Sequence, residues 1–111
     1  MATSIIKVKN PYASGNIRIY NFELPIGQSA TISGDGFRGF LITNAISSPP
    51  QGMYILGKNS TGTIHGLTDV KSSTVISITY SDGEFIVTNN SSNALVYCML
   101  FTSALQTITV S

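Results

Sequence analysis

The sequence predicts an all-β protein, a single antiparallel β-sandwich domain of jelly-roll type over residues 1–111. Three observations predict this class. Short alternating apolar runs recur roughly every 8 to 12 residues, and clusters of turn-forming residues separate them. No stretch of about 11 residues or more has helical periodicity. About eight or nine strands are therefore expected, a number typical of two packed sheets.

The clearest element is a hairpin over residues 75–90, VISITYSDGEFIVTNN. Asp82 and Gly83 separate two β-rich runs. An Asp-Gly pair favours a type I′ turn, because both central residues of that turn need positive φ. The turn places Tyr80 opposite Phe85 on one apolar face. A slip of one residue would expose that face to water, so turn and pattern predict the same register.

The remaining strands are expected to be short. They cover residues 1–9, 16–22, 29–33, 37–46, 53–57, 63–67, 95–101 and 104–111. Residues 47–52, SSPPQG, are expected to form an exposed loop, since two prolines remove two ladder donors. Residues 69–73 are expected to be a turn, and residues 89–93 a loop.

Two of these strands are apolar on both faces. In residues 95–101, Tyr97 and Met99 alternate with Val96 and Cys98, and residues 37–46 are similar. A half-exposed antiparallel strand has one polar face. Both strands are therefore expected to be covered on both sides, by the second sheet or by another subunit.

Composition excludes several classes of function. Only 10% of the residues are charged, the formal net charge is +1, and the six cations are scattered, so no basic surface for nucleic acid is expected. The longest apolar runs are far shorter than the ~20 residues of a membrane helix, and no signal peptide is expected, because the first residues lack its apolar core. The 15 serines, 12 threonines and 8 asparagines predict a soluble protein with a hydroxyl- and amide-rich surface.

Neither a metal site nor a cofactor is expected. Cys98 is the single cysteine and His65 the single histidine, whereas zinc takes several such ligands at short spacing. With one cysteine, no intrachain disulfide can form. Cys98 is expected to be a small buried side chain in a strand.

No catalytic residue is expected, and the protein is interpreted as non-enzymatic. Asp82 and Glu84 are explained by the hairpin turn, and nothing around His65 supplies a nucleophile or an orienting acid. An enzyme such as a glycan depolymerase would need a site shared between subunits, with Glu23 or Asp69 contributing a carboxylate.

Tyrosine rings offer an apolar face on which a sugar can stack. Tyr80 and Tyr97 are better explained as core or interface residues by their strand positions. Tyr12 and Tyr54 lie in or beside turn-rich segments and stay open as binding residues.

Four segments occur in a characteristic order: GQSATISGDGFRGFLITNA, GMYILGKNSTGTIHGL, ISITYSDGEFIVTNNSS and ALVYCMLF. A glycine-led strand precedes an arginine-glycine apolar strand, a tyrosine-containing strand follows a small-residue loop, and a polar loop leads into a final apolar strand. This order resembles that of the C-terminal head domains of bacteriophage fibres and tail receptor-binding proteins. The resemblance starts near residue 27 and covers roughly three quarters of the chain.

The resemblance implies a homotrimeric knob on the virion, assembled in the host bacterial cytoplasm and joined to a fibre shaft or other virion proteins. It implies attachment to a host cell-surface glycan or protein receptor. The outward face of residues 95–101 would then contact neighbouring subunits. The alternative is a structural virion decoration or baseplate module that binds no receptor. For the receptor site, the expected residues are Tyr54, Asn59 and His65, close to loops 47–52 and 58–62.

Overall fold

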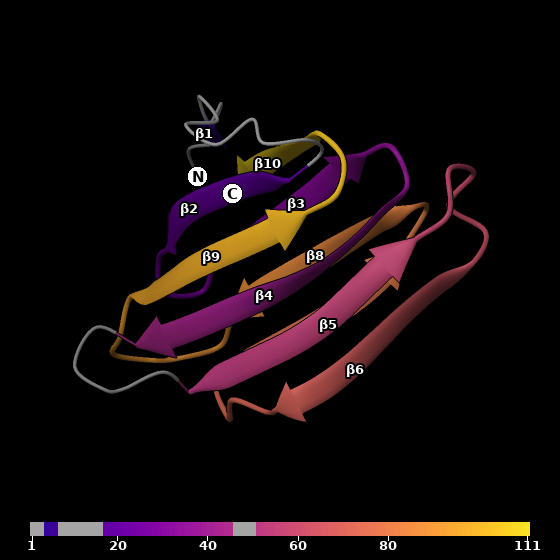
Figure 1. Ribbon diagram of the computed structural model, residues 1–111. Coiled ribbons are helices and arrows are strands. Elements are labelled where there is room, and N and C mark those ends of the chain that lie inside the picture. Colours follow the sequence, from indigo (N-terminus) through magenta and orange to yellow (C-terminus); the bar gives the residue numbers. More distant parts are fainter. Residues whose placement is uncertain (1–3, 7–16, 46–50) are drawn as a thin grey trace.

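The computed structural model describes residues 4–6, 17–45 and 51–111, and within these ranges it contains strands and no helix. The strands are β1 (Ser4–Ile6), β2 (Arg18–Leu24), β3 (Ser29–Gly34), β4 (Phe37–Ala45), β5 (Gly52–Lys58), β6 (His65–Lys71), β7 (Ile76–Ser81), β8 (Glu84–Asn89), β9 (Val96–Thr102) and β10 (Gln106–Val110). They form two layers (Figure 1).

Both sheets are antiparallel and five-stranded. Their orders are β1-β10-β3-β8-β7 and β2-β9-β4-β5-β6. Early strands pair with late ones, β1 with β10, β2 with β9 and β3 with β8, as in a long hairpin rolled up on itself. This is the jelly-roll arrangement, with β6 and β7 added at the two edges. The predicted fold class is confirmed.

The predicted hairpin is confirmed residue by residue. Asp82 and Gly83 have φ values of 52° and 82°, the two positive angles that a type I′ turn needs. Tyr80 lies opposite Phe85, as the alternation required. Phe85 is buried, whereas Tyr80 on the edge strand is half-buried because fewer residues of the other sheet cover it.

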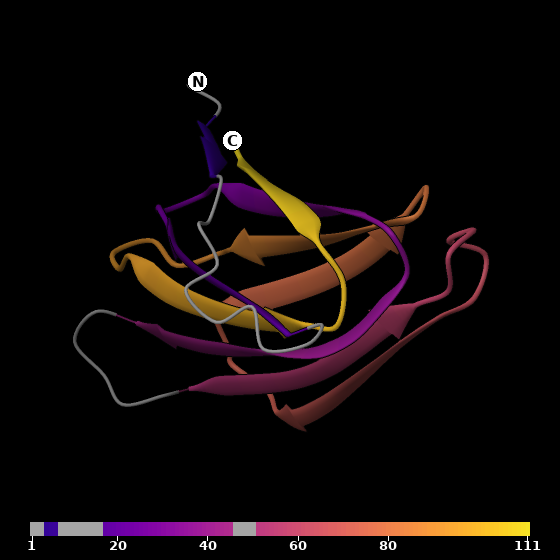
Figure 2. The ribbon, with the colours of Figure 1, turned by 45° about the horizontal axis from the view of Figure 1, so that its top comes forward.

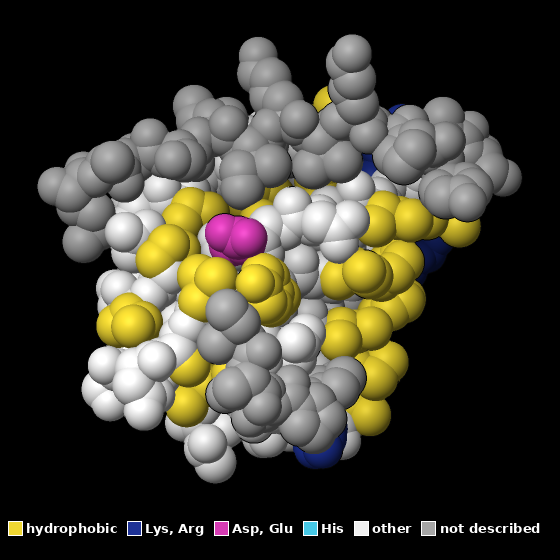
Figure 3. Space-filling model, turned by 90° about the vertical axis from the view of Figure 1, so that its left-hand side faces the viewer, with side chains coloured by type: hydrophobic (Ala, Val, Ile, Leu, Met, Phe, Trp, Pro, Cys, Tyr) yellow, Lys and Arg dark blue, Asp and Glu magenta, His cyan; other side chains and the backbone are white. Residues whose placement is uncertain are grey.

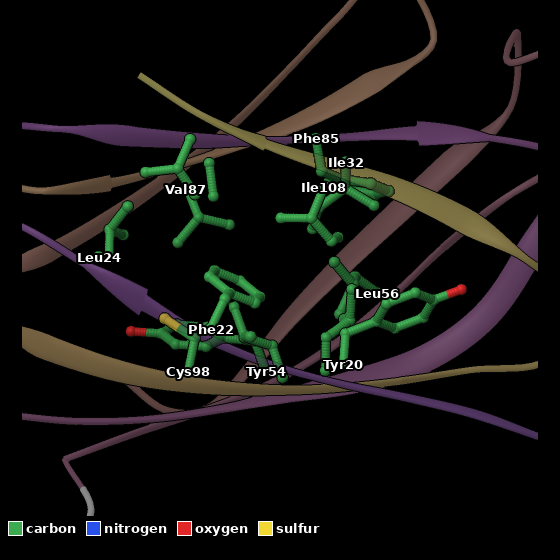
Figure 4. Close-up of a cluster of buried hydrophobic side chains, with 14 of the residues drawn as sticks. Tyr20, Phe22, Leu24, Ile32, Tyr54, Leu56, Phe85, Val87, Cys98 and Ile108 are labelled. Atoms are coloured by element: carbon green, nitrogen blue, oxygen red, sulfur yellow. The ribbon is translucent and has the colours of Figure 1, made fainter. Parts of the chain in front are cut away.

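The core lies between the sheets, where alternate residues of both inner faces meet (Figure 4). Tyr20, Phe22 and Leu24 extend inward from β2, and Ile108 and Val110 from β10. The buried apolar residues also include Ala30, Ile32, Phe37, Leu41, Tyr54, Leu56, Phe85, Val87, Val96, Cys98 and Leu100. Each large side chain stabilises the fold by roughly 1.5–3 kcal/mol. The core is therefore complete within one chain.

Some sequence predictions are wrong. Residues 69–71 belong to β6 and not to a turn, because they pair with β5 across a bulge near Met53. Strand β2 extends to Leu24, beyond the expected strand over residues 16–22. Asn89, expected in a loop over residues 89–93, is the last residue of β8 and is buried. The predicted loop over residues 47–52 lies largely outside the described residues, as does Tyr12.

The strands place two groups of connections at opposite ends of the sandwich. The turns after β3, β5, β7 and β9 lie together at one end, on the right in Figure 1. The register of β1 with β10 pairs Ser4 with Val110, so the start of β1 and the end of β10 lie toward the other end. Figure 2 shows the end of β10 away from the turns after β5 and β7.

Candidate functional site

Four connections make up what we call the turn end: residues 34–36, 59–64, 82–83 and 103–105. Lys58 joins three of them, because its Nζ donates to the carbonyl oxygens of Gly34 and Gly83 while its own strand leads into residue 59. Tyr80 donates its hydroxyl hydrogen to the Gly62 carbonyl at 2.6 Å. These bonds connect the tips of both sheets, so the turn end is held as one unit.

Close backbone contacts also hold the turn end. A Cβ on Gly62 would lie 2.9 Å from the Gly83 Cα, and a Cβ on Gly36 would lie 2.6 Å from the Ser60 nitrogen. Real Cβ atoms do not approach backbone this closely, so glycine is what allows these turns to touch. The Gln106 side chain adds a bond from Nε2 to the Asp35 carbonyl at 2.8 Å.

Two of the three residues expected to bind a receptor lie at or beside the turn end. Asn59 shapes residues 59–64, since its Oδ1 accepts from the Ile64 N–H at 3.0 Å and its Nδ2 donates to Thr63 Oγ1. His65 is exposed and stacks on Tyr80, with ring centroids 3.7 Å apart and planes 17° apart. Both also support the local structure, and their role in binding stays a prediction.

The third residue, Tyr54, is not available at the surface, and that expectation is wrong. Its ring lies in the core, and its hydroxyl accepts a hydrogen bond from the Ser73 N–H at 2.9 Å. Burial raises the pKa of Tyr54 above its ordinary value. The proline loop before β5 suggested an open position, but the alternation of β5 sends Tyr54 inward and Ile55 outward.

Beside the turn end lies a polar hollow of about 270 Å³. Its lining contains hydroxyl, ammonium and carboxylate groups and backbone of the turns: Ser33, Gly34, Lys58, Ser60, Thr61, Gly62, Asp82, Gly83 and Glu84. Such groups form hydrogen bonds with polar ligands.

The carboxylates considered for an enzyme site are separated. Asp69 accepts from the Ser72 hydroxyl at 2.8 Å, at the end of β6. Glu23 lies at the opposite edge of the same sheet, on its outer side. No set of three or more metal-binding side chains occurs in the part of the chain that the structure describes. Within the same residues, no helix is long and apolar enough to cross a membrane.

The second candidate surface is the outer face of the β2-β9-β4-β5-β6 sheet, which we call the outer face. Cross-strand partners share a side of a sheet, so the registers arrange its side chains in rows. From the end opposite the turn end, the rows are Glu23, Tyr97 and Asn44; Asn21, Met99, Ile42, Met53 and Lys71; Ile19, Phe101, Phe40, Ile55 and Thr68; and Arg38, Gly57 and Gly66.

The middle rows of the outer face are apolar and open to solvent. Ile55 is 52% exposed, Met99 38% and Met53 36%. Phe40 and Phe101 stack with centroids 4.4 Å apart, beside an apolar groove of about 690 Å³. In Figure 3, hydrophobic side chains follow the right-hand margin, where this face is seen edge-on. Among the residues that the structure describes, the strands expected to be covered on both sides are thus covered on one side only.

The sequence indicated part of this surface and missed the rest. The two-faced pattern of residues 95–101 identified Tyr97 and Met99. It did not identify Met53 and Ile55 as their neighbours, because that requires the β4–β5 register. Lys58 gave no signal either, since the carbonyls it binds converge only in the folded chain.

Comparison with known proteins yields no match among protein-family models, characterised proteins or solved structures. The resemblance to bacteriophage head domains therefore stays a prediction.

Proposed function

We propose that this protein is a non-enzymatic attachment head of the bacteriophage fibre type, which works as a homotrimer on the virion and binds a host cell-surface glycan or protein. The outer face is the observation that carries this proposal. Contiguous exposed apolar patches often mark interaction sites. Here such a surface lies on a fold whose core is already complete, so its apolar side chains are explained by contact with other subunits.

The positions of the two ends support the attachment role. The start of β1 and the end of β10 lie toward one end of the sandwich, and the turn end lies at the other. A connection to a fibre shaft or to other virion proteins at the chain ends leaves the turn end pointing away. Binding residues are commonly found on loops that a rigid scaffold positions, and Lys58 and Tyr80 supply that rigidity here.

The surface chemistry of the turn end suits recognition of a receptor. The polar hollow offers Ser60 and Thr61 hydroxyls and the Asp82 carboxylate. The side chain of Ile64, 71% exposed, adds an apolar contact next to His65. Several shallow sites on one trimer would strengthen attachment to a cell surface through multivalency.

Cell binding tests the proposal. The fluorescently labelled chain is incubated with a panel of Gram-positive and Gram-negative bacteria, and retained label is measured by flow cytometry. We expect strong labelling of at least one species. Ile64→Asp and His65→Ala should each reduce it roughly tenfold or more, as for residues at the centre of an interface. Ser92→Ala, an exposed change in the loop between β8 and β9, should leave it unchanged.

If Ile64→Asp and His65→Ala leave the labelling of cells unchanged, the receptor site lies elsewhere on the protein. A stable trimer that labels no species in the panel would contradict attachment. That result would favour the alternative of a structural virion decoration or baseplate module.

A further inference from the structure

The charged residues around the outer face also indicate how copies of the chain are related by symmetry. This inference rests on the proposed function, in which copies of the chain meet through that face. With a strand spacing of about 4.8 Å and a rise of about 3.4 Å per residue, the two middle rows across four strands cover roughly 260 Å² in projection. Standard interfaces bury ~800 Å² of each partner. The apolar rows therefore match the core of an interface, with the charged residues around them as its rim.

The charges on this rim have both signs and occupy opposite edges. Glu23 lies on β2, one edge of the sheet, and Lys71 lies on β6, the other edge. Both are exposed and within one row of each other along the strands, at the end opposite the turn end. Neither forms an ion pair with another described residue. A surface of this kind can complement a second copy of itself.

The direction of the symmetry axis decides whether these charges meet. A rotation about an axis parallel to the central strand β4 leaves every residue at the same position along the strand direction. It brings the β2 edge of one copy next to the β6 edge of the next copy. Glu23 then meets Lys71 of the neighbouring copy. A rotation about an axis across the strands exchanges the two ends instead, and it takes Glu23 away from any Lys71.

The number of copies, three, is taken from the proposed function. Arg38 lies on β4, the middle strand, in the row nearest the turn end. Any axis parallel to β4 brings the Arg38 residues of the copies toward that axis, and like-charge repulsion between them opposes close approach of the copies at that end.

We propose that three copies surround an axis parallel to β4 with their outer faces inward, and that Glu23 of each copy pairs with Lys71 of the next. In this arrangement the three turn ends lie together at one tip of the trimer. All chain ends lie at the other tip, on the side where a shaft would join.

Charge reversal tests the pairing. Glu23→Lys, Lys71→Glu and the double variant are compared with the wild-type full chain by sedimentation equilibrium at low salt. Each trimer has three pairs, so each single reversal should weaken assembly at least ~10-fold in dissociation constant. The double variant restores opposite charges and should return to within about threefold of wild type. High salt should reduce the differences.

Asp35→Lys serves as the matched control, because it changes the net charge as Glu23→Lys does but lies at the turn end. It should leave assembly unchanged. A wild-type monomer would contradict the proposed function itself. A wild-type dimer would contradict the three-fold axis. If both single reversals weaken assembly and the double variant does not restore it, the Glu23–Lys71 pairing alone would be contradicted.

Discussion

At the scale of single residues, burial decides what each side chain can do. Cys98 lies in the core on the inner side of β9, and burial raises the pKa of its thiol to about 12. A buried neutral thiol is inert, because the thiolate is the reactive form. Cys98 therefore acts as a small apolar side chain, as the sequence predicts.

The raised pKa of Cys98 predicts a pH dependence of stability. The folded chain keeps the thiol proton up to about pH 12, whereas the unfolded thiol loses it near its ordinary value of 9.0. The stabilisation is thus present below pH 9 and is lost as the pH rises from 9 to 12. Each pH unit in this window costs up to ~1.4 kcal/mol.

Urea unfolding at pH 7.5 and pH 10.5, at one protein concentration, checks this expectation. The free energy of unfolding of the wild type should fall by about 2 kcal/mol more than that of Cys98→Ala. Comparing the two proteins removes the contribution of tyrosines and lysines, which titrate in both. Equal losses in both proteins would show that Cys98 ionises normally in the folded state.

Tyr54 shows that the burial of a single residue could not always be predicted from the sequence. Its neighbours in the sequence, a proline-rich loop and a polar turn, indicated an exposed ring. Its depth depends instead on which side of β5 faces the other sheet, and this is determined by pairing with β4 and β6. Local composition does not contain that information.

At the scale of the elements, the strands and their alternation were predictable, and the edges were not. The hairpin over residues 75–90 combines turn chemistry with a strict apolar period, so its register followed from sequence. Strand β6 has no buried residue in its span. Its pairing with β5 is a tertiary contact that the local sequence does not indicate. Residues 69–71 were therefore predicted to be a turn.

Because β4 and β9 pack closely at Gly39, adding one methyl group there is expected to reduce the stability of the fold strongly. A Cβ on Gly39 would lie 1.9 Å from the Phe101 carbonyl oxygen, and a backbone atom cannot move aside easily. Gly39→Ala should therefore destabilise the protein by ~3 kcal/mol, the upper end for overpacking. Thermal or urea unfolding measures this loss.

Gly66→Ala is the matched control for Gly39→Ala. Gly66 lies on the same sheet, on edge strand β6, and a Cβ there meets no atom within 4 Å. Its stability should change by less than about 0.5 kcal/mol. Similar losses for both variants would contradict the described β4–β9 contact.

At the scale of the whole molecule, the fold supports two different surfaces. The inner faces of both sheets form the core. Several of the exposed apolar side chains lie together on the outer face, and turns held by glycine contacts and by Lys58 lie together at one end. The sequence predicted that a strand face was left for a neighbour. It could not predict that Glu23 and Lys71 flank that face at opposite edges, because their relation depends on five strands in register.

The central claim is that the outer face joins copies of this chain, and the mass of the full chain in solution tests it most directly. Light scattering after size-exclusion chromatography, over micromolar concentrations, should give three times the 11.8 kDa of one chain. Met99→Asp, in the middle of the outer face, should give a folded monomer, whereas Leu105→Asp at the turn end should stay a trimer. A wild-type chain that remains a monomer throughout this range would contradict the account.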